Sequence, residues 1–568
     1  MAEEEAGQET NLGAYSPVDY MSITSFPRLP EDDTGSTDNV LRYRKDDDSS
    51  LCDPDTTDPD LFLKSARLQR LPSSSSEMGS QEMSPLRVTN KDPFSSDCAC
   101  RQDGLTVIIT ACLTFATGVT VALIMQIYFG DPQIFHQGAV VTDVAHCSTV
   151  GTEILNRDGS SVDAAIVSAL CLGIIHPHSS GIGGGGVMLV HDIRKNESFI
   201  IDFRETAPAE VEEQMFVHNW EDKPGLLVAV PGMIQGLHQA HQLYGRISWS
   251  ELMAAAAKVA QDGFNVTQEL EGLSEKDEPT MVNKVTKEIN LSGNNMWCSL
   301  PSSRALLIPY SFYLQSLKIA LALASSLSDP FFNSTVTQLI EQMLSKSEAK
   351  ILHQLINDSA AFPPAHYLPF YSLETGSSAS QVHVFGPDDF IVSVVSSLNR
   401  PFGSGIMTAS GVLLNSQMLD FSWSNKAQDN STANLRNSIQ AGKRPVSFLL
   451  PTIVRPLRGM CGTYLSLGAS GGTNTLSSLT EVLLNIFSFR KHLNESLALG
   501  RFYPQLQPNV LLVENEFPEE EVEFLAERGH TVMREEIHSL VHVARRINDF
   551  ITGAKDPRSS DAAAAVIL

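Results

Sequence analysis

The feature that most constrains this chain is a run of 25 uncharged residues, 105–129, well inside the sequence. As a helix rising 1.5 Å per residue, the run would extend roughly 37 Å, enough to cross the apolar core of a bilayer. A buried core helix of this length would carry a polar face, and a cleaved signal peptide would be shorter and nearer the N-terminus. We therefore predict a single transmembrane helix.

Basic residues flank this run on one side only. Arg87, Lys91 and Arg101 precede it, whereas the next basic residue after it is Arg157. The positive-inside rule therefore predicts a single-pass type II protein, with a cytoplasmic N-terminus and a lumenal or extracellular C-terminal region. The N-glycosylation sequons agree with this orientation because all of them follow the run: Asn196, Asn265, Asn290, Asn333, Asn357, Asn430 and Asn494.

Residues 1–104 have the composition of a disordered acidic tail. They hold 21 acidic and 10 basic residues, a serine run and scattered prolines, with little hydrophobic periodicity. The whole chain has a net charge of −26, which argues against a nucleic-acid partner because phosphate binding requires clustered Lys and Arg.

Two predicted strands in the C-terminal half flank a Gly-Pro-Asp-Asp turn. They cover residues 382–385 and 390–398 and are rich in β-branched side chains. Ser378 and Ser380 precede the first strand in a small, polar run that we expect to be flexible and open to chain cleavage. A hydroxyl residue that becomes N-terminal has its own α-amino group beside it as a base. An ordinary exposed hairpin shows the same pattern.

Four consecutive glycines, Gly183 to Gly186, precede a predicted strand and imply close approach of the backbone to another group. They do not open a helix with Lys-Ser or Lys-Thr, so we exclude a phosphate-binding loop. A second strand, 199–203, ends at Arg204, whose guanidinium either clamps a carboxylate or pairs with Glu205. Helices are expected over 145–155, 165–175, 234–243, 249–260 and 315–327.

The cysteine pattern suggests one candidate crosslink. Cys147 and Cys171 fall on two adjacent predicted helices, where an oxidising compartment would allow a disulfide and a reducing one would leave two buried thiols. The cysteine spacings show no metal-binding pattern, and we expect neither a metal nor a cofactor.

Several different short motifs follow one another in a fixed order between residues 159 and 558. The first group is Gly159…Asp163-Ala164-Ala165, Gly181-Ile182-Gly183-Gly184-Gly185, Arg204-Glu205-Thr206-Ala207-Pro208, Val230-Pro231-Gly232 and Gln261-Asp262-Gly263-Phe264. The second is Lys443-Arg444-Pro445-Val446-Ser447, Pro451-Thr452-Ile453, Gly468-Ala469-Ser470-Gly471-Gly472-Thr473 and Asp556-Pro557-Arg558. In order, they resemble the large-subunit and small-subunit motifs of the γ-glutamyltransferases, also called glutathione hydrolases, most closely the type-7 branch. The resemblance covers about residues 137–270 and 310–568.

This resemblance implies an α/β fold of the N-terminal-nucleophile hydrolase class, an αββα sandwich behind the transmembrane helix. It implies autocatalytic cleavage of a precursor into a large-subunit-like region, 130–377, and a small-subunit-like catalytic region, 378–568, that stay associated. The implied substrates are glutathione and other γ-glutamyl compounds, and the implied acceptors are water, amino acids or peptides. The family's disulfide between adjacent helices matches Cys147 and Cys171.

Carried over by residue, the resemblance implies a γ-glutamyl pocket. Arg204 would hold the α-carboxylate of the γ-glutamyl group, with a further hydrogen bond from Ser447. Asn399 and Asp420 would contact its carboxylate and amino group. The complete set of predicted substrate-binding residues is Arg204, Ser397, Asn399, Gln417, Asp420, Ser447 and Phe448.

The predicted catalytic residues are a nucleophile and two backbone donors. The family begins its small subunit with Thr-Ala-His or a close variant. Gapless alignment backward from Asn399 places Ala379 at the Thr, whereas one inserted residue places Ser378-Ala379 on Thr-Ala. We predict Ser378 as the nucleophile, with Ser380 second. The N–H groups of Gly471 and Gly472 would form the oxyanion hole.

The chain departs from the family in its pocket and its length. Phe448 replaces the second serine of a Ser-Ser pair, and Gln417 replaces an acid that would pair with the substrate amine. Losing that charge-assisted hydrogen bond costs about 1.5–3 kcal/mol in a buried site. The region 269–311 is also shorter than in the family. We predict a γ-glutamyltransferase or glutathione hydrolase; the alternative is a weakly active or inactive membrane-anchored relative with a binding or regulatory role.

Overall fold

A computed structural model describes two parts of the chain, a single helix and a large folded region. The helix and the folded region belong to different compact units, and each is described by itself. The described residues are 104–129 and 137–567, except 217, 219, 277–306, 358–359, 368–369, 373–375, 424–425, 427–432, 458–461 and 537–538. The predicted acidic tail therefore lies outside the described residues.

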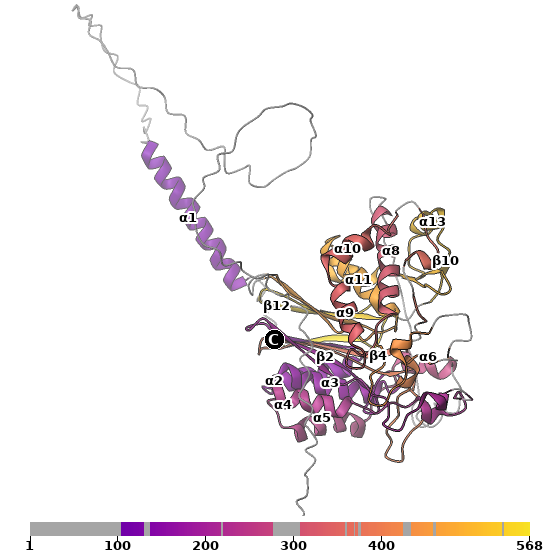
Figure 1. The fold of residues 1–568 in the computed structure, drawn as a ribbon. Coiled ribbons are helices and arrows are strands. Elements are labelled where there is room, and N and C mark those ends of the chain that lie inside the picture. The colour runs from indigo at the N-terminus through magenta and orange to yellow at the C-terminus, as the bar shows by residue number, and fades with distance from the viewer. Residues whose placement is uncertain are drawn as a thin grey trace, which may run out of the picture. The chain divides into compact units, whose positions relative to one another are not determined.

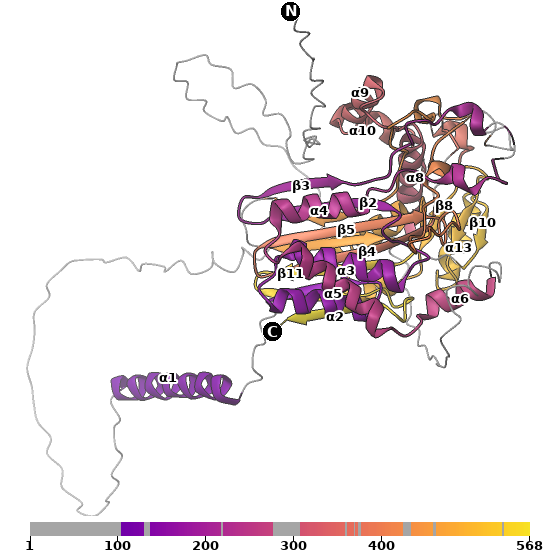
Figure 2. The same ribbon diagram turned by 90° about the horizontal axis from the view of Figure 1, so that it is seen from below.

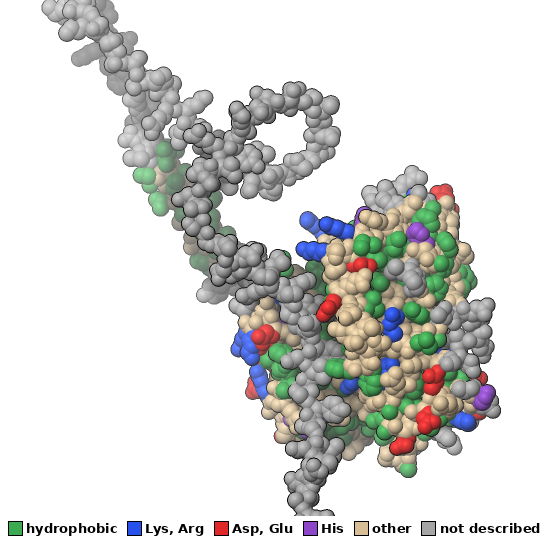
Figure 3. Space-filling model, viewed as in Figure 1, with side chains coloured by type: hydrophobic (Ala, Val, Ile, Leu, Met, Phe, Trp, Pro, Cys, Tyr) green, Lys and Arg blue, Asp and Glu red, His purple; other side chains and the backbone are tan. Residues whose placement is uncertain are grey.

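The single helix is α1, Gly104–Phe129, and it matches the predicted membrane span. Its central part, Val107–Met125, carries no charged residue and its side chains are exposed (Figure 3). By length and composition, α1 suffices to cross a membrane.

Two antiparallel sheets form the centre of the folded region (Figure 1). The larger has the order β13-β1-β4-β5-β2-β3, and the smaller has the order β12-β11-β7-β6. Their strands are β1 Gly138–Thr142, β2 Gly185–Asp192, β3 Glu197–Asp202, β4 Ser378–Phe385, β5 Phe390–Asn399, β6 Thr452–Val454, β7 Thr463–Ala469, β11 Val541–Ile547, β12 Phe550–Ala554 and β13 Ala563–Ile567. A separate three-stranded sheet joins β8 Phe502–Pro504, β9 Leu511–Val513 and β10 Val532–Arg534.

Helices cover the outer faces of the two central sheets. Helices α2 to α5 pack on the larger sheet (Figure 2), and α11 and α12 pack on the smaller one. The resulting order of layers is helix, sheet, sheet, helix. The helices are α2 Ala145–Asn156, α3 Ser161–Ile175, α4 Met233–Tyr244, α5 Trp249–Asp262, α6 Gln268–Lys276, α8 Leu307–Ala324, α9 Ser334–Met343, α10 Lys346–His353, α11 Asn474–Phe487, α12 Leu493–Ala498 and α13 Glu519–Glu527.

Burial on both faces explains the composition of β4 and β5. One face, including Val382 and Val394, packs against α3, while Phe385 and Ile391 pack against the smaller sheet. Neither face meets water, and the face toward the smaller sheet also carries buried polar side chains, among them Gln381, His383 and Ser393. The β-branched residues that suggested the hairpin therefore form the middle of the core.

The helix pair α2–α3 is fixed at its start and across its interface. Ser160 caps α3 by accepting a hydrogen bond from the Asp163 N–H, and the Asp163 carboxylate accepts one from the Ser160 N–H. A disulfide joins Cys147 on α2 to Cys171 on α3. Of the two states left open for these cysteines, the structure contains the bridged one.

The glycine run is packed against backbone, as the sequence predicted. A Cβ on Gly183 would lie 1.9 Å from the Leu413 carbonyl oxygen, and one on Gly184 would lie 2.4 Å from the Ser397 carbonyl oxygen. Both distances are shorter than a non-bonded carbon–oxygen contact. The segment between α3 and β2 can therefore approach the neighbouring backbone only because these two positions carry no Cβ.

Three sequence expectations need correction. The run containing Ser378 and Ser380 is not a flexible segment: it is the start of β4, because pairing with β5 continues as far as Asn399. Residues 138–142, for which the sequence predicted no strand, form β1 between β13 and β4. The helix expected over 315–327 is α8, which begins and ends earlier.

Replacing Gly183 by alanine tests the close approach. We expect Gly183→Ala to destabilise the protein by about 1–3 kcal/mol, because the added methyl group meets a backbone carbonyl that cannot rotate away. Gly225→Ala is the control, since a Cβ there has no atom within 4 Å. Thermal unfolding of the two variants should show a lower midpoint for Gly183→Ala alone. Equal midpoints would contradict this account of the glycine run.

Candidate active site

The candidate site lies at one end of the larger sheet, where four strands begin or end. The hairpin β4–β5 is closed at Gly386–Asp389, so its open end carries Ser378, the first residue of β4, directly opposite Asn399, the last residue of β5. The register shifts by one residue between Ser378 and Ser380. Because β2 and β3 are antiparallel to their neighbours, the start of β2 and the end of β3 lie at the same edge.

Arg204 follows β3 and is buried between two carboxylates. Its Nη1 donates to Glu205 Oε2 at 3.0 Å, and its Nη2 donates to Asp420 in a short ion pair. All three side chains are buried, and among the residues that the structure describes, the Arg204 Nε and Glu205 Oε1 have no hydrogen-bond partner. The sequence left two roles open for Arg204, a clamp for a carboxylate or a partner of Glu205, and the structure contains the pairing with Glu205. The guanidinium nevertheless retains unused donors, among them its Nε–H.

Burial changes the protonation of both carboxylates. Desolvation raises the pKa of Glu205 to about 7, against the opposing attraction of Arg204. Desolvation also raises the pKa of Asp420, although Arg204, Lys426 and the amide of Asn399 favour its charged form. One guanidinium therefore faces two acids, of which Glu205 is partly protonated near neutral pH.

Asn399 connects this cluster to the hairpin. Its backbone has φ of +81°, which turns the chain sharply at the end of β5. Its side-chain amide donates to Asp420 Oδ1 at 2.6 Å and to Gln417 Oε1 at 3.3 Å. Gln417 and Asp420 are the two ends of the short 3₁₀ helix Gln417–Asp420. This helix therefore brings both residues to the end of β5.

The loop between β7 and α11 contacts the chain just before β4. The Gly471 N–H donates to the Ser377 carbonyl oxygen at 2.9 Å. The Ser397 hydroxyl donates to the next carbonyl oxygen, that of Ser378, at 2.5 Å. Gly471 and Gly472 have φ of +116° and +59°, a conformation that glycine adopts without strain. The Ser377–Ser378 peptide thus lies beside the loop predicted to form the oxyanion hole.

A small pocket collects most of the predicted residues. Ala379 is the β4 residue on its wall, and Ser378 and Gly471 are not among its lining residues. Ser447 accepts a hydrogen bond from the Leu449 N–H, and Phe448 is buried beside it. The lining residues are Arg204, Gly376, Ala379, Ser397, Asn399, Gln417, Asp420, Ser447, Phe448, Leu449, Ala469, Gly472 and Thr475.

Two features of the site were not assigned from the sequence. Glu205, considered only as a partner that would occupy Arg204, is a buried member of the charged cluster. Asn437 holds the 3₁₀ helix in place by donating from its amide to the Asp420 carbonyl oxygen at 2.7 Å. The Arg-Glu-Thr-Ala-Pro motif contains the signal for Glu205, whereas no motif contains Asn437.

The remaining predicted positions are distributed over the surface and core. Ser380, the second nucleophile candidate, is buried, and its hydroxyl has no hydrogen-bond partner among the described residues. The sequon residue Asn333 is half-buried, and Asn290 and Asn430 lie outside the described residues. The other sequon asparagines are exposed: Asn196, Asn265, Asn357 and Asn494.

Comparisons with known proteins identify similar sequences and a similar fold. A sequence profile described as Gamma-glutamyltranspeptidase matches residues 147–300 and 300–566. The chain is 53% identical to proteins named Glutathione hydrolase 7 from Homo sapiens and Bos taurus, over alignments of 667 positions that cover 100% of both chains. A crystal structure of cephalosporin acylase from Bacillus halodurans covers 77% of this chain and 98% of its own, with 18% identity and a TM-score of 0.60. That structure shows likeness of fold alone.

The same comparisons bear on the shortened region. The alignments to both mammalian relatives run over 667 positions, whereas this chain has 568 residues, so part of each relative has no counterpart here. The two profile matches meet at residue 300, within the region 269–311 predicted to be short.

Replacing Glu205 tests the buried charge cluster. The pKa of Glu205 is about 7 in the native state, compared with the usual value of 4.5 in the unfolded chain. Between these values the native state binds more protons, so this group makes the free energy of unfolding fall as the pH rises. Glu205→Gln should flatten that fall between pH 4.5 and 7.

Denaturant unfolding at several pH values measures this dependence. Glu210→Gln, which changes an exposed glutamate of the same segment, should keep the wild-type dependence. If Glu205→Gln also keeps it, Glu205 does not carry a raised pKa in the native state.

Proposed function

The chain belongs to the γ-glutamyltranspeptidase family, and from this premise we propose that it is a membrane-anchored glutathione hydrolase of the N-terminal-nucleophile class. It cleaves the γ-glutamyl bond of glutathione and its conjugates and passes the glutamyl group to water, an amino acid or a peptide. Full-length similarity to proteins named Glutathione hydrolase 7 supports the reaction, and the layered fold supports the class.

The observation that carries the mechanism is the hydrogen bond from the Gly471 N–H to the Ser377 carbonyl oxygen, 2.9 Å long. In the proposed maturation step, Ser378 Oγ attacks the Ser377 carbonyl carbon while the oxygen gains negative charge. A backbone N–H aimed at that oxygen stabilises the charge as it develops. The Ser377–Ser378 C–N bond breaks to give an ester, and water hydrolyses the ester to a Ser377 carboxylate and a free Ser378 amine.

The same groups serve the proposed reaction with substrate. The free α-amino group of Ser378 takes the proton from its own hydroxyl, and Oγ attacks the γ-carbonyl carbon of the glutamyl group. The N–H groups of Gly471 and Gly472 receive the oxyanion, and the leaving amine takes the proton. Water or an acceptor amine then attacks the acyl-enzyme ester and restores the Ser378 hydroxyl.

The charged cluster supports recognition of the glutamyl α-carbon. The unused Nε–H of Arg204 is a donor for the substrate carboxylate, assisted by Ser447. Asp420 is the acceptor for the substrate amine, positioned by Asn399. The rest of the proposed pocket wall includes Ser397, Gln417 and Phe448.

The proposed topology and subunits follow from the sequence. We propose that α1 anchors the chain with residues 1–104 in the cytoplasm and the catalytic region outside the cell or in the lumen, where the sequons are glycosylated. The exposed sequon residues and the Cys147–Cys171 disulfide fit that compartment. Cleavage before Ser378 gives a large subunit ending at 377 and a small subunit of 378–568 that remain paired through β1 and β4.

Substitution of Ser378 tests the proposed nucleophile. Ser378→Ala should abolish both self-cleavage and release of the γ-glutamyl group, because it removes the attacking oxygen; Ser378→Thr should retain both. Ser380→Ala is the matched control and should be cleaved normally. An immunoblot of a C-terminal tag after deglycosylation reports cleavage. An uncleaved wild-type chain would overturn the enzyme mechanism and leave the alternative of a membrane-anchored binding protein.

Substitution of Asp420 tests the pocket. We expect Asp420→Asn to raise KM for a γ-glutamyl substrate about 10- to 100-fold, since a charge-assisted hydrogen bond is worth about 1.5–3 kcal/mol. Asp389→Asn is the control, because Asp389 also pairs with arginines but lies at the closed end of the same hairpin. Steady-state kinetics of the cleaved enzymes measures the effect. An unchanged KM for Asp420→Asn would exclude contact with the substrate amine.

A further inference from the structure

Two histidines and a glutamate gather outside the proposed active site. His176 and His178 follow α3 on the segment that leads to the glycine run, and Glu269 lies in the first turn of α6. His178 Nε2 is 3.3 Å from Glu269 Oε1, and His176 Nδ1 is 3.9 Å from Glu269 Oε2. One potential ligand atom from each residue lies within 4.8 Å of the other two. We call these residues the histidine cluster.

The burial of His178 suggests that this cluster is more than an ion pair. Its side chain is 1% exposed, yet neither of its ring nitrogens makes a hydrogen bond within the described part of the chain. The contact with Glu269 is close in distance but lacks hydrogen-bond geometry. A buried polar group without a partner costs free energy, and native proteins seldom retain one without a role. A cation between the rings and the carboxylate would supply the missing interaction.

His176 is held in an orientation that suits a ligand. Its Nε2 lies 2.9 Å from the Thr267 hydroxyl, which leaves Nδ1 on the side of Glu269. Metal-binding histidines commonly have their second nitrogen fixed by a neighbouring polar group in this way.

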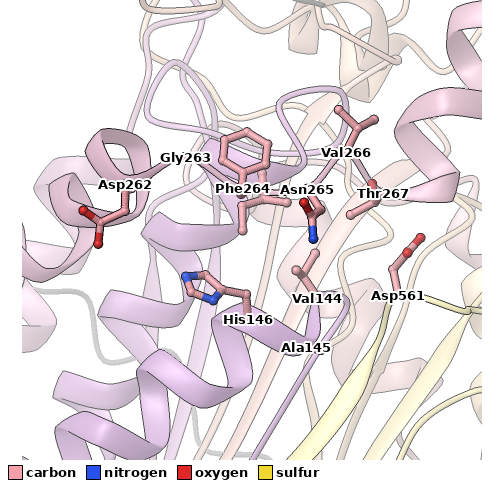
Figure 4. Close-up of a pocket in the computed structure, with 11 residues that line it drawn as sticks. Val144, Ala145, His146, Asp262, Gly263, Phe264, Asn265, Val266, Thr267 and Asp561 are labelled. Atoms are coloured by element: carbon pink, nitrogen blue, oxygen red, sulfur yellow. The ribbon is translucent and has the colours of Figure 1, made fainter. Parts of the chain in front are cut away.

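A cavity lies next to the cluster, although His176, His178 and Glu269 are not among its lining residues. It has a volume of about 540 Å³ and is lined by Ile175, at the end of α3, and by Thr267. Figure 4 shows Thr267 on the wall of this cavity together with Asp561 and His146. Glu269 is 40% exposed and its N–H donates to Asp561 Oδ2 at 3.3 Å, which fixes the start of α6.

We propose that the histidine cluster is a zinc site, with His176 Nδ1, His178 Nε2 and the Glu269 carboxylate as ligands and water in the fourth position. Two imidazoles and one carboxylate are a ligand set that zinc accepts, with bonds of about 2.0–2.2 Å. Tetrahedral bonds of that length separate two ligand atoms by about 3.3 Å. The distances to Glu269, 3.3 Å to Oε1 and 3.9 Å to Oε2, are close to this value, and separations of up to 4.8 Å within the set would shorten when the ion binds.

This zinc site joins α6 to the segment before the glycine run. The carbonyl oxygens of His178 and Ser179 accept hydrogen bonds from the Phe402 N–H, at 3.0 Å, and the Leu398 N–H, at 2.9 Å. These donors lie on either side of Asn399, so the bound ion braces the wall of the candidate active site. The proposal concerns the binding of the ion and does not depend on the proposed reaction.

Competition for Zn²⁺ with a colorimetric chelator tests the site on the full-length protein in detergent, after removal of bound metals. Wild type and His146→Gln, a control that changes an exposed histidine lining the same cavity, should compete equally for one zinc per chain. His178→Gln should weaken that binding at least tenfold. Zinc should raise the unfolding temperature of the first two proteins and not that of His178→Gln. Equal binding by all three proteins, or no zinc uptake by wild type, would overturn the proposal.

Cobalt decides the question without any substitution, should His178→Gln fail to fold. Wild-type protein loaded with Co²⁺ should show intense tetrahedral visible absorption that Zn²⁺ abolishes. It should show no thiolate charge-transfer band, because the cluster contains no cysteine. The weak absorption of octahedral Co²⁺, or a strong thiolate band, would place the ion elsewhere and overturn the proposal.

Discussion

The pairing of β4 with β5 determines the geometry on which the rest of the site depends. An antiparallel hairpin brings the first residue of one strand opposite the last residue of the other, and here those residues are Ser378 and Asn399. The pair is held from both faces, by α3 and by the smaller sheet, and residues in the middle of both strands are fully buried. Ser378 and Asn399 therefore lie at the end of a rigid scaffold rather than on a free loop.

The buried charges beside this hairpin are costly and point to a role. Arg204, Glu205 and Asp420 are almost completely removed from water, and pairing repays only part of the desolvation cost. The raised pKa of Glu205 reduces the cost by allowing a proton in place of a second negative charge. The unused Arg204 Nε–H is what a binding site for an incoming carboxylate would require before the ligand arrives.

Much of this arrangement could be predicted from the sequence. The helix α1, the β4–β5 hairpin, the packed glycine run and the helix pair carrying Cys147 and Cys171 all follow from composition, periodicity and motif order. The start of β4 was misjudged because small polar residues such as Ser378 resemble a loop, and only pairing with β5 makes them a strand.

Several contacts between distant segments could not be predicted, although the family resemblance did predict that Arg204 and Asp420 share a pocket. Glu205 is buried because Asp420, more than two hundred residues away in sequence, returns to share Arg204. The Gly471–Ser377 hydrogen bond joins the two central sheets through a loop and has no local signal. Likewise, no sequence spacing indicates that Glu269 reaches His176 and His178. Such contacts depend on the completed fold, so periodicity and local propensity cannot reveal them.

The measurement that tests the central account most directly is the mass and N-terminal sequence of the C-terminal fragment purified from cells. The account predicts a fragment that begins with Ser378-Ala379-Ser380 and carries a free α-amino group. A fragment that begins at Ser380 would instead identify Ser380 as the nucleophile. An intact chain without any such fragment would contradict the proposed activation of Ser378 altogether.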